Sequence, residues 1–195
     1  MEREGVGMEG ELDGSACPFG KQGEARPLDL ASRPILEVRR PGRRDVPGLA
    51  VLLAEMQRHY RDPVSDSEAE RAAVLACRPA PPPESFEPRT LIAVEPPGRV
   101  CGSIVLNVTF PATRLSRSLY VRDLYVAAAV RRRGVARALL RAAAQLTLAE
   151  GFSALDWTAD SANAPARSMY DASGAATLGR VYYRLAGEAL AKAAA

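Results

Sequence analysis

The sequence of 195 residues contains a single histidine, His59, and only three cysteines at irregular spacing. A metal centre made of several histidines is therefore excluded, as is a Ser-His-Asp triad that does not use His59. Cys17, Cys77 and Cys101 match neither a zinc motif nor a disulfide framework, so we expect free thiols in a reducing compartment. These absences predict a cytoplasmic protein without a bound metal.

Net charge and long hydrophobic runs are also lacking. The formal net charge of +3 is too small to indicate nucleic-acid binding, and the basic residues form one compact cluster without interleaved aromatic residues. No run approaches the roughly 20 apolar residues of a membrane-spanning helix, and the acidic start lacks the apolar core of a signal peptide. The composition, with 47% hydrophobic and 25% charged residues, is that of a soluble globular protein. We expect neither a nucleic-acid partner nor a membrane partner.

The pattern along the chain predicts one folded domain between two tails. Residues 1–33 are rich in Gly and Glu without periodicity, which indicates a disordered N-terminal tail. Residues 34–187 form the domain, and residues 188–195 form a C-terminal tail. The predicted elements are a strand (35–39), two helices (46–60 and 66–77), three strands (90–95, 99–110 and 118–126), a helix ending near 150, a strand (153–159), a helix (164–173) and one or two last strands (176–185).

This order of elements predicts an α/β fold, a mixed sheet with helices on both faces. Asp45 is expected to cap the first helix, and Ser65 or Asp66 the second. A proline-rich loop over residues 78–88 separates the second helix from the first strand of a hairpin.

The stretch VRRRGVARALL, residues 130–140, places several arginines and one glycine directly before an apolar helical pattern. Cations are locally unfavourable at a helix N-terminus, whose free N–H groups favour an anion. Gly134 allows both a tight turn and the close approach of a ligand. The stretch therefore predicts a ligand with several phosphates, and a solvated basic helix start is the alternative. The arginines concerned are Arg131, Arg132, Arg133 and Arg137.

Two motifs resemble those of the GNAT acetyltransferase superfamily. The spacing Arg131-x-x-Gly134-x-Ala136 resembles the pyrophosphate-binding motif Gln/Arg-x-x-Gly-x-Gly/Ala of that family. Downstream, NAPARSMYDASGA resembles the Asn-x-x-Ala-x-x-x-Tyr-x-x-x-Gly segment, with Asn163 and Tyr170 at the matching positions. The resemblance covers about residues 35–186.

Within the superfamily, the diamine (spermidine/spermine-like) acetyltransferases look most similar. The likeness lies in LLAEMQRHY, FPATRLSRSLYVRDLYV and LDWTADSANAPARSMY. Arg122 departs from that branch, in which an acidic residue tends to stand beside the aspartate. This departure places a polycationic acceptor in doubt and favours amines that carry one positive charge.

The resemblance implies a mostly antiparallel central sheet with a splayed parallel pair, here DLYV and LDWTA. It also implies acetyl-CoA as co-substrate, no metal, and direct attack by an amine on the thioester. Backbone groups of Leu124, Tyr125 and Val126 would pair with the pantetheine arm, and Asn163 would hydrogen-bond the arm or cap its helix. The pyrophosphate would be held by Arg131, Arg132, Arg133, Gly134, Val135, Ala136 and Arg137.

Tyr170 is the candidate general acid for the leaving thiolate. A phenol has a reference pKa of about 10, above the value of about 8.5 for a thiol, and so remains protonated at neutral pH. The alternative is that Tyr170 only packs on a buried helix face, which is the role expected of Tyr182 and Tyr183.

Asp123 is the candidate for the acceptor side. Strand alternation gives it Val121 and Tyr125 as neighbours on one face, so it is a carboxylate on an otherwise apolar face. It would bind an ammonium group or accept its proton through water, and an ion pair with an arginine is the alternative.

Other candidates for the acceptor pocket are His59 and Tyr60 at the end of the first helix, and Trp157 as a wall. A histidine at a helix C-terminus also serves as a favourable charge at that end, so His59 keeps both interpretations. The loops over residues 78–88 and 110–117 are expected to narrow the acceptor groove. The sequence thus predicts an enzyme acting on a small primary amine, and we also expect a homodimer. A protein N-terminal or lysine acetyltransferase and a non-catalytic CoA-binding module remain as alternatives.

Overall fold

The computed structural model describes residues 36–195, so the tail predicted over residues 1–33 lies outside the described part. Five strands form one sheet in the order β1-β2-β3-β4-β5. Neighbouring strands are antiparallel as far as β4, and β5 runs parallel to β4. The strands are β1 (Glu37–Arg39), β2 (Arg89–Glu95), β3 (Arg99–Thr109), β4 (Ser118–Val126) and β5 (Leu155–Asp156). The mixed sheet predicted from the order of elements is confirmed.

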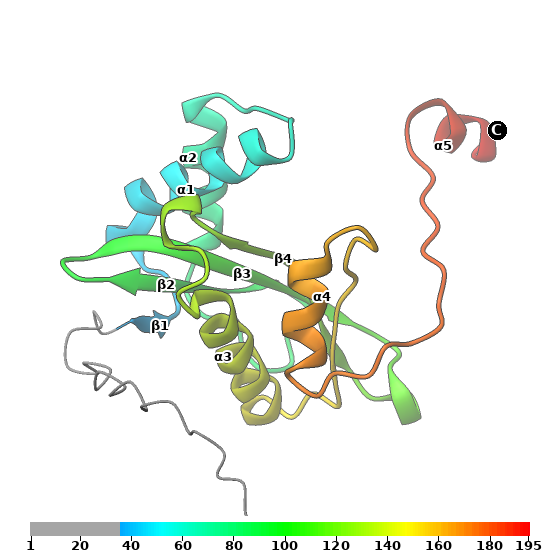
Figure 1. The fold of residues 1–195 in the computed structure, drawn as a ribbon. Coiled ribbons are helices and arrows are strands. Elements are labelled where there is room, and N and C mark those ends of the chain that lie inside the picture. The colour runs from blue at the N-terminus through cyan, green and yellow to red at the C-terminus, as the bar shows by residue number, and fades with distance from the viewer. Residues whose placement is uncertain (1–35) are drawn as a thin grey trace, which may run out of the picture. The chain divides into compact units, whose positions relative to one another are not determined.

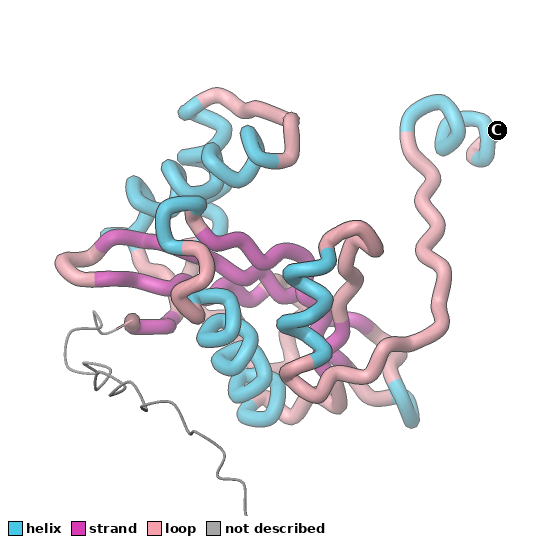
Figure 2. Tube along the Cα trace, in the orientation of Figure 1, coloured by secondary structure: helices cyan, strands magenta, loops and turns pink. Residues whose placement is uncertain are grey.

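Helices pack on both faces of this sheet (Figure 1, Figure 2). One core lies between the sheet and helices α1 and α2, and a second core lies between the sheet and α3. The helices are α1 (Val46–His59), α2 (Asp66–Ala76), α3 (Val135–Ala149), α4 (Ala164–Asp171) and α5 (Gly187–Ala193), with short 3-10 turns at Arg43–Asp45, Thr113–Leu115 and Ala128–Val130. No helix within residues 36–195 is long and apolar enough to cross a membrane.

Of the two predicted helix caps, the one at Ser65 forms and the one at Asp45 does not. Ser65 caps α2, since its hydroxyl accepts from the Glu68 N–H while the Glu68 carboxylate accepts from the Ser65 N–H. Asp45 stands at the N-cap of α1 but makes no side-chain cap. Its buried carboxylate instead accepts from the Arg39 guanidinium at 2.7 and 2.8 Å, which ties α1 to β1 and holds the pKa of Asp45 below its usual value.

A β-bulge in β4 corrects the predicted surroundings of Asp123. Val121 pairs with Leu106 and Asp123 pairs with Val105, so Arg122 is an extra residue without an opposite partner. The bulge shifts the alternation by one residue. Val121 packs into the α3-side core, whereas Tyr125 belongs to the core beneath α1 and α2, on the face that Asp123 shares. Asp123 and Tyr125 are therefore neighbours on one face, and Val121 is on the other.

The strands predicted over residues 176–185 are not formed in the described structure. This segment is extended coil that joins α4 to α5 and has no partner strand. Tyr182 and Tyr183, predicted to pack against the protein, are 67% and 87% exposed. The prediction of packing was wrong because a strand-like pattern buries its apolar face only where a neighbouring strand is present.

The proline-rich loop before β2 is held by a fully buried arginine. Arg89 is 0% exposed, and its Nε donates to Glu150 Oε2 at 2.9 Å. Arg40 binds the other carboxylate oxygen of Glu150 at 2.6 Å. The two terminal nitrogens of Arg89 donate to backbone carbonyls of the loop, those of Pro82, Pro83, Ser85 and Glu87. One guanidinium thus joins this loop to the end of α3.

Replacing Arg89 by methionine should destabilise the protein strongly. The Arg89→Met variant keeps a long side chain but leaves four loop carbonyls without their donor and the Glu150 carboxylate with Arg40 alone. We expect the free energy of unfolding in urea to fall by about 3–5 kcal/mol, the range for breaking a buried ion pair. Arg99→Met is the control, because the Arg99 guanidinium is largely exposed while it pairs with Glu95. Equal midpoints for the two variants would show that Arg89 does not tie the loop down.

Candidate active site

The site lies where β4 and β5 separate. The two strands pair only at Leu119 with Leu155 and at Tyr120 with Asp156. Beyond these pairs β4 continues to Val126, hydrogen-bonded to β3 on its other side. The backbone of residues 124–126 therefore has an edge that no strand of the described chain occupies. Peptide groups on such an edge are available to a ligand in extended conformation.

The turn into α3 points free N–H groups at the same place. Gly134 is the N-cap of α3 in the left-handed conformation, with φ 86° and ψ 1°, and no side chain caps the helix. The first turn contains no acidic residue that would neutralise the helix end. A Cβ built at Gly134 would meet no atom within 4 Å, so the space above the turn is open. An anion is the group that this arrangement favours.

The four arginines near this turn have different surroundings. Arg131 donates from Nε to the Val126 carbonyl at 3.1 Å, and its guanidinium lies 5.5 Å from the centroid of the Tyr125 ring. Arg133 pairs with the buried carboxylate of Glu95 at 3.2 Å. Arg131, Arg132 and Arg137 are exposed and form no ion pair among the described residues, but only Arg132 and Arg137 also make no side-chain hydrogen bond there. All four remain in one region, but two of them also bind the protein itself.

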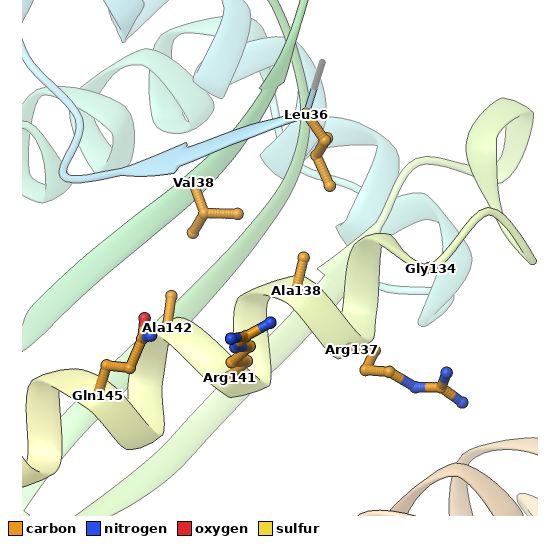
Figure 3. Close-up of a pocket in the computed structure, with 8 residues that line it drawn as sticks. All are labelled: Leu36, Val38, Gly134, Arg137, Ala138, Arg141, Ala142 and Gln145. Atoms are coloured by element: carbon orange, nitrogen blue, oxygen red, sulfur yellow. The ribbon is translucent and has the colours of Figure 1, made fainter. Parts of the chain in front are cut away.

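A groove between β1 and α3 borders the same helix turn (Figure 3). Leu36, which precedes β1, and Val38 within β1 face Ala138 and Ala142 of α3 in this view. Arg137 extends away from these apolar residues. Its guanidinium is therefore not part of the floor of the groove and remains beside the start of α3.

Asp123, Tyr60 and Tyr170 converge from three elements on the opening between β4 and β5. Burial raises the pKa of Asp123, although the Leu124 backbone N–H and Arg122 oppose the effect. Burial and the charge of Asp123 raise the pKa of Tyr60, and burial together with Tyr60 raises the pKa of Tyr170. The charge of Asp123 thus acts on Tyr60, and Tyr60 acts on Tyr170, which indicates that the three groups share one region. Asp123 forms no ion pair within residues 36–195, so the predicted alternative of an arginine partner is not seen there.

His59 and Trp157 provide aromatic surfaces on two sides of this cluster. The His59 ring lies 5.4 Å from the Tyr60 ring and 5.9 Å from the Tyr125 ring, measured between centroids. The Trp157 ring lies 5.2 Å from the Tyr170 ring at a tilt of 53°. Trp157 is also partly buried against the α3-side core, which fits the role of a wall.

Asn163 begins α4 and caps it. Its side-chain oxygen accepts from the Ala166 N–H at 3.2 Å. Capping occupies one acceptor of the amide and leaves its NH₂ group free to donate. The cap and a contact to a bound ligand are therefore compatible.

Glu55 is a site residue that the sequence analysis did not identify. Its Oε1 accepts from the Tyr125 hydroxyl at 3.0 Å and from the Ala128 N–H at 2.8 Å. The carboxylate thus fixes α1 to the end of β4, and burial together with Glu55 raises the pKa of Tyr125. The only signal in the sequence is the position of Glu55 next to the buried residue Met56 on a helix, which does not distinguish it from any surface glutamate.

The comparisons with known proteins agree with the fold and the motifs. A model of the acetyltransferase (GNAT) family matches residues 52–175. No curated protein matches the chain significantly. Among solved structures, an integron cassette protein from the mobile metagenome of V. cholerae is 28% identical, with a TM-score of 0.68 over 82% of this chain and 97% of that chain.

Two further structures are similar in fold. A ribosomal-protein-alanine N-acetyltransferase from Brucella melitensis is 21% identical, with a TM-score of 0.61 over 78% of this chain and 99% of that one. An aminoglycoside acetyltransferase from an uncultured soil metagenomic sample is 24% identical, with a TM-score of 0.59 over 78% and 99% of the two chains.

The helix turn can be tested with CoA as a probe that carries a pyrophosphate. Gly134→Glu places bulk and negative charge in the open space above the turn, and we expect calorimetry to detect no CoA binding. Gly134→Ala is the matched control, because it imposes the same strain at positive φ without the charge or the bulk. It should retain measurable affinity. A folded Gly134→Glu variant that binds CoA as tightly as the native protein would show that the pyrophosphate does not lie at this turn.

Proposed function

We propose that this chain, which belongs to the acetyltransferase (GNAT) family and is an acyl-CoA N-acyltransferase, transfers the acetyl group of acetyl-CoA to a small primary amine. Attack would be direct, without a covalent enzyme intermediate. The observation that carries the proposal is the opening between β4 and β5, with an anion-favouring helix start at one end and a half-buried carboxylate, Asp123, inside.

The residues present fit CoA as the co-substrate, which enzymes of this family use. The free N–H groups at the start of α3 and the exposed Arg132 and Arg137 would bind the pyrophosphate. The unoccupied edge of β4 at residues 124–126 would hydrogen-bond the pantetheine arm as a further strand does. An N–H group of this edge would also polarise the thioester carbonyl as charge develops on its oxygen.

Tyr170 is proposed as the group that protonates the departing thiolate. Burial raises its pKa further above the ordinary value, so the phenol remains protonated throughout the neutral range. No hydrogen bond of the Tyr170 hydroxyl to another described residue competes for its proton. Trp157 would hold the ring in place through the tilted contact between the two aromatic rings.

Asp123 is proposed to bind the acceptor amine. A half-buried carboxylate without an ion-pair partner gains most from a cation that enters beside it. A single carboxylate of this kind matches one ammonium group, and the aromatic rings of His59 and Tyr60 would contact the apolar part of the amine. Arg122 stands next to Asp123 in the chain and disfavours a second positive charge nearby. This reasoning supports a monoamine rather than a polyamine, the preference that Arg122 already favoured in the sequence.

A protein N-terminus or a lysine side chain is the second candidate for the acceptor. The loop 110–117 enters β4 at Ser118, the end at which β4 and β5 are still paired, and the ring of Phe86 in the proline-rich loop contacts that of Phe110. Both loops therefore lie at the other end of β4 from Asp123, and they do not narrow the opening as the sequence suggested. Structural neighbours of both types, an aminoglycoside enzyme and a ribosomal-protein enzyme, share the fold.

Removing the Tyr170 hydroxyl should slow the chemical step. We expect Tyr170→Phe to lower kcat by roughly 10²-fold, at the low end for general acid catalysis, with little change in acetyl-CoA affinity. Release of free thiol measures the rate, and calorimetry measures the affinity. Tyr120→Phe serves as the control, since it removes a tyrosine hydroxyl that only bonds Thr158. A Tyr170→Phe enzyme within twofold of the native kcat would assign Tyr170 to packing alone.

The acceptor class can be read from kcat/KM values for a panel of amines. Small monoamines and amines with a carboxylate of their own should exceed both spermidine and a lysine-containing peptide. A tenfold preference for the peptide would replace the small-amine proposal by the protein alternative. A preference for spermidine would show that Arg122 does not repel a second cation.

Asp123→Asn should raise KM for the preferred amine or lower kcat while leaving acetyl-CoA binding unchanged. Asp171→Asn removes the same charge next to Tyr170 from an exposed position and should change neither constant by more than about twofold. Because burial raises the pKa of Asp123, the native KM for the amine should begin to rise with falling pH at a higher pH than an exposed aspartate would give. If KM of the Asp123→Asn variant rose with falling pH as the native KM does, Asp123 would not be the origin of this pH dependence.

A further inference from the structure

The turn between β4 and α3 is held by a carboxylate from another element of the fold. Residues 127–134 join β4 to α3 and contain the short 3-10 turn Ala128–Val130. Figure 1 shows this yellow-green segment beside α1. Glu55 of α1 accepts a hydrogen bond from the Ala128 N–H at 2.8 Å. The start of the turn is therefore fixed to a helix that packs on the sheet.

The same carboxylate oxygen also holds the side chain of Tyr125. The Tyr125 hydroxyl donates to Oε1 of Glu55 at 3.0 Å. Tyr125 is only 4% exposed and belongs to the core beneath α1 and α2. Its backbone lies in the part of β4 that β5 does not reach. One oxygen atom thus fixes both a side chain of the free edge of β4 and the start of the turn that follows.

Arg131 extends this line of contacts towards the start of α3. Its guanidinium lies 5.5 Å from the centroid of the Tyr125 ring, and its Nε donates to the Val126 carbonyl at 3.1 Å. The attraction between a guanidinium and an aromatic face depends on the orientation of the ring. The ring that Glu55 holds in place therefore also helps to place Arg131, the first residue of the predicted pyrophosphate motif.

The turn needs contacts from outside to keep its shape. Residues 131–134 are exposed, and Arg132 adopts a left-handed φ of 64°, which is uncommon for a residue other than glycine. A conformation of this kind persists where the surrounding structure determines it. Two carboxylates supply such contacts, Glu55 at the start of the turn and Glu95 through its ion pair with Arg133. The shape of the turn thus depends on α1 as well as on its own sequence.

We infer that Glu55 is a positioning residue for CoA, an inference that rests on the proposed function. Glu55 would contact neither the cofactor nor the acceptor amine. By holding Tyr125 and the Ala128 N–H, it keeps the free edge of β4 and the turn before α3 in one fixed arrangement. A pantetheine arm on the edge and a pyrophosphate at the turn could then bind without prior ordering of the protein. Without Glu55, CoA would have to order the turn as it binds, which lowers its affinity.

Calorimetry with CoA on the full chain tests this role. We expect Glu55→Ala to weaken CoA binding roughly tenfold, because two hydrogen-bond donors lose their common acceptor. Glu55→Gln should restore the affinity to within about threefold of the native value, since its amide oxygen can accept both hydrogen bonds. Glu70→Ala is the matched control, because Glu70 is an exposed glutamate of α2 without an ion pair among the described residues. It should bind CoA as the native protein does.

Tyr125→Phe separates positioning from folding. It removes the hydroxyl but keeps the buried ring in the core, and it should weaken CoA binding by about threefold. If Glu55 acts partly through Tyr125, the double variant should lose less affinity than the product of the two single losses. Urea unfolding of every variant checks that it is folded under the conditions of the binding assay.

Steady-state kinetics supplies a readout that a general loss of structure would not give. In Glu55→Ala the KM for acetyl-CoA should rise with the dissociation constant of CoA. The KM for the preferred amine should change by less than about twofold, because neither hydrogen bond of Glu55 goes to Asp123.

Four results would count against the inference, and they are distinguishable. A native protein that binds no CoA overturns both the proposed function and the role of Glu55. Native binding of CoA with equal affinity in Glu55→Ala overturns the role of Glu55 alone. Independent effects of Glu55→Ala and Tyr125→Phe show that the contact between the two residues does not position the cofactor. Glu55→Gln with native CoA affinity but a large loss of kcat assigns Glu55 to proton transfer instead.

Discussion

The backbone of β4 has more hydrogen-bonding groups than the sheet uses. Along its inner side β3 pairs with it from Ser118 to Val126, but along its outer side β5 pairs with it at two positions only. Peptide groups in a half-buried strand must be paired or solvated, and those past Tyr120 have no strand to pair with. The opening that results lies beside Asp123, and it exists because β5 is too short to follow β4 to its end.

Sequence patterns anticipated the parts of this arrangement that depend on local chemistry. The glycine turn before α3 and the Ser65 cap follow from backbone requirements of single residues, so both could be located in the sequence. The bulge at Arg122 could not, because arginine has no preference for the extra position and the bulge arises from pairing with β3. Asp123 therefore faces the α1 side rather than sharing a face with Val121.

The C-terminal segment, residues 176–185, shows the opposite relation between pattern and structure. Its alternation predicts a strand, yet no strand forms there in the described chain, so this prediction was wrong. Alternation records which side chains would be buried in a strand, but it does not supply the neighbouring strand that buries them. Val181 and Tyr183 therefore remain exposed in the described chain.

The two ends of the opening differ in the charged residues that lie beside them. At the α3 end, positive charge exceeds what the protein itself neutralises, since Glu95 pairs with Arg133 while Arg132 and Arg137 remain without an ion pair among the described residues. At the other end lies Asp123, half-buried and without an ion pair among the described residues, whose charge adds to burial in raising the pKa of Tyr60. An anionic cofactor and a cationic acceptor would each neutralise one end. Burial opposes the ionised form of Asp123, so a cationic acceptor of the kind proposed would itself supply the charge that stabilises this carboxylate.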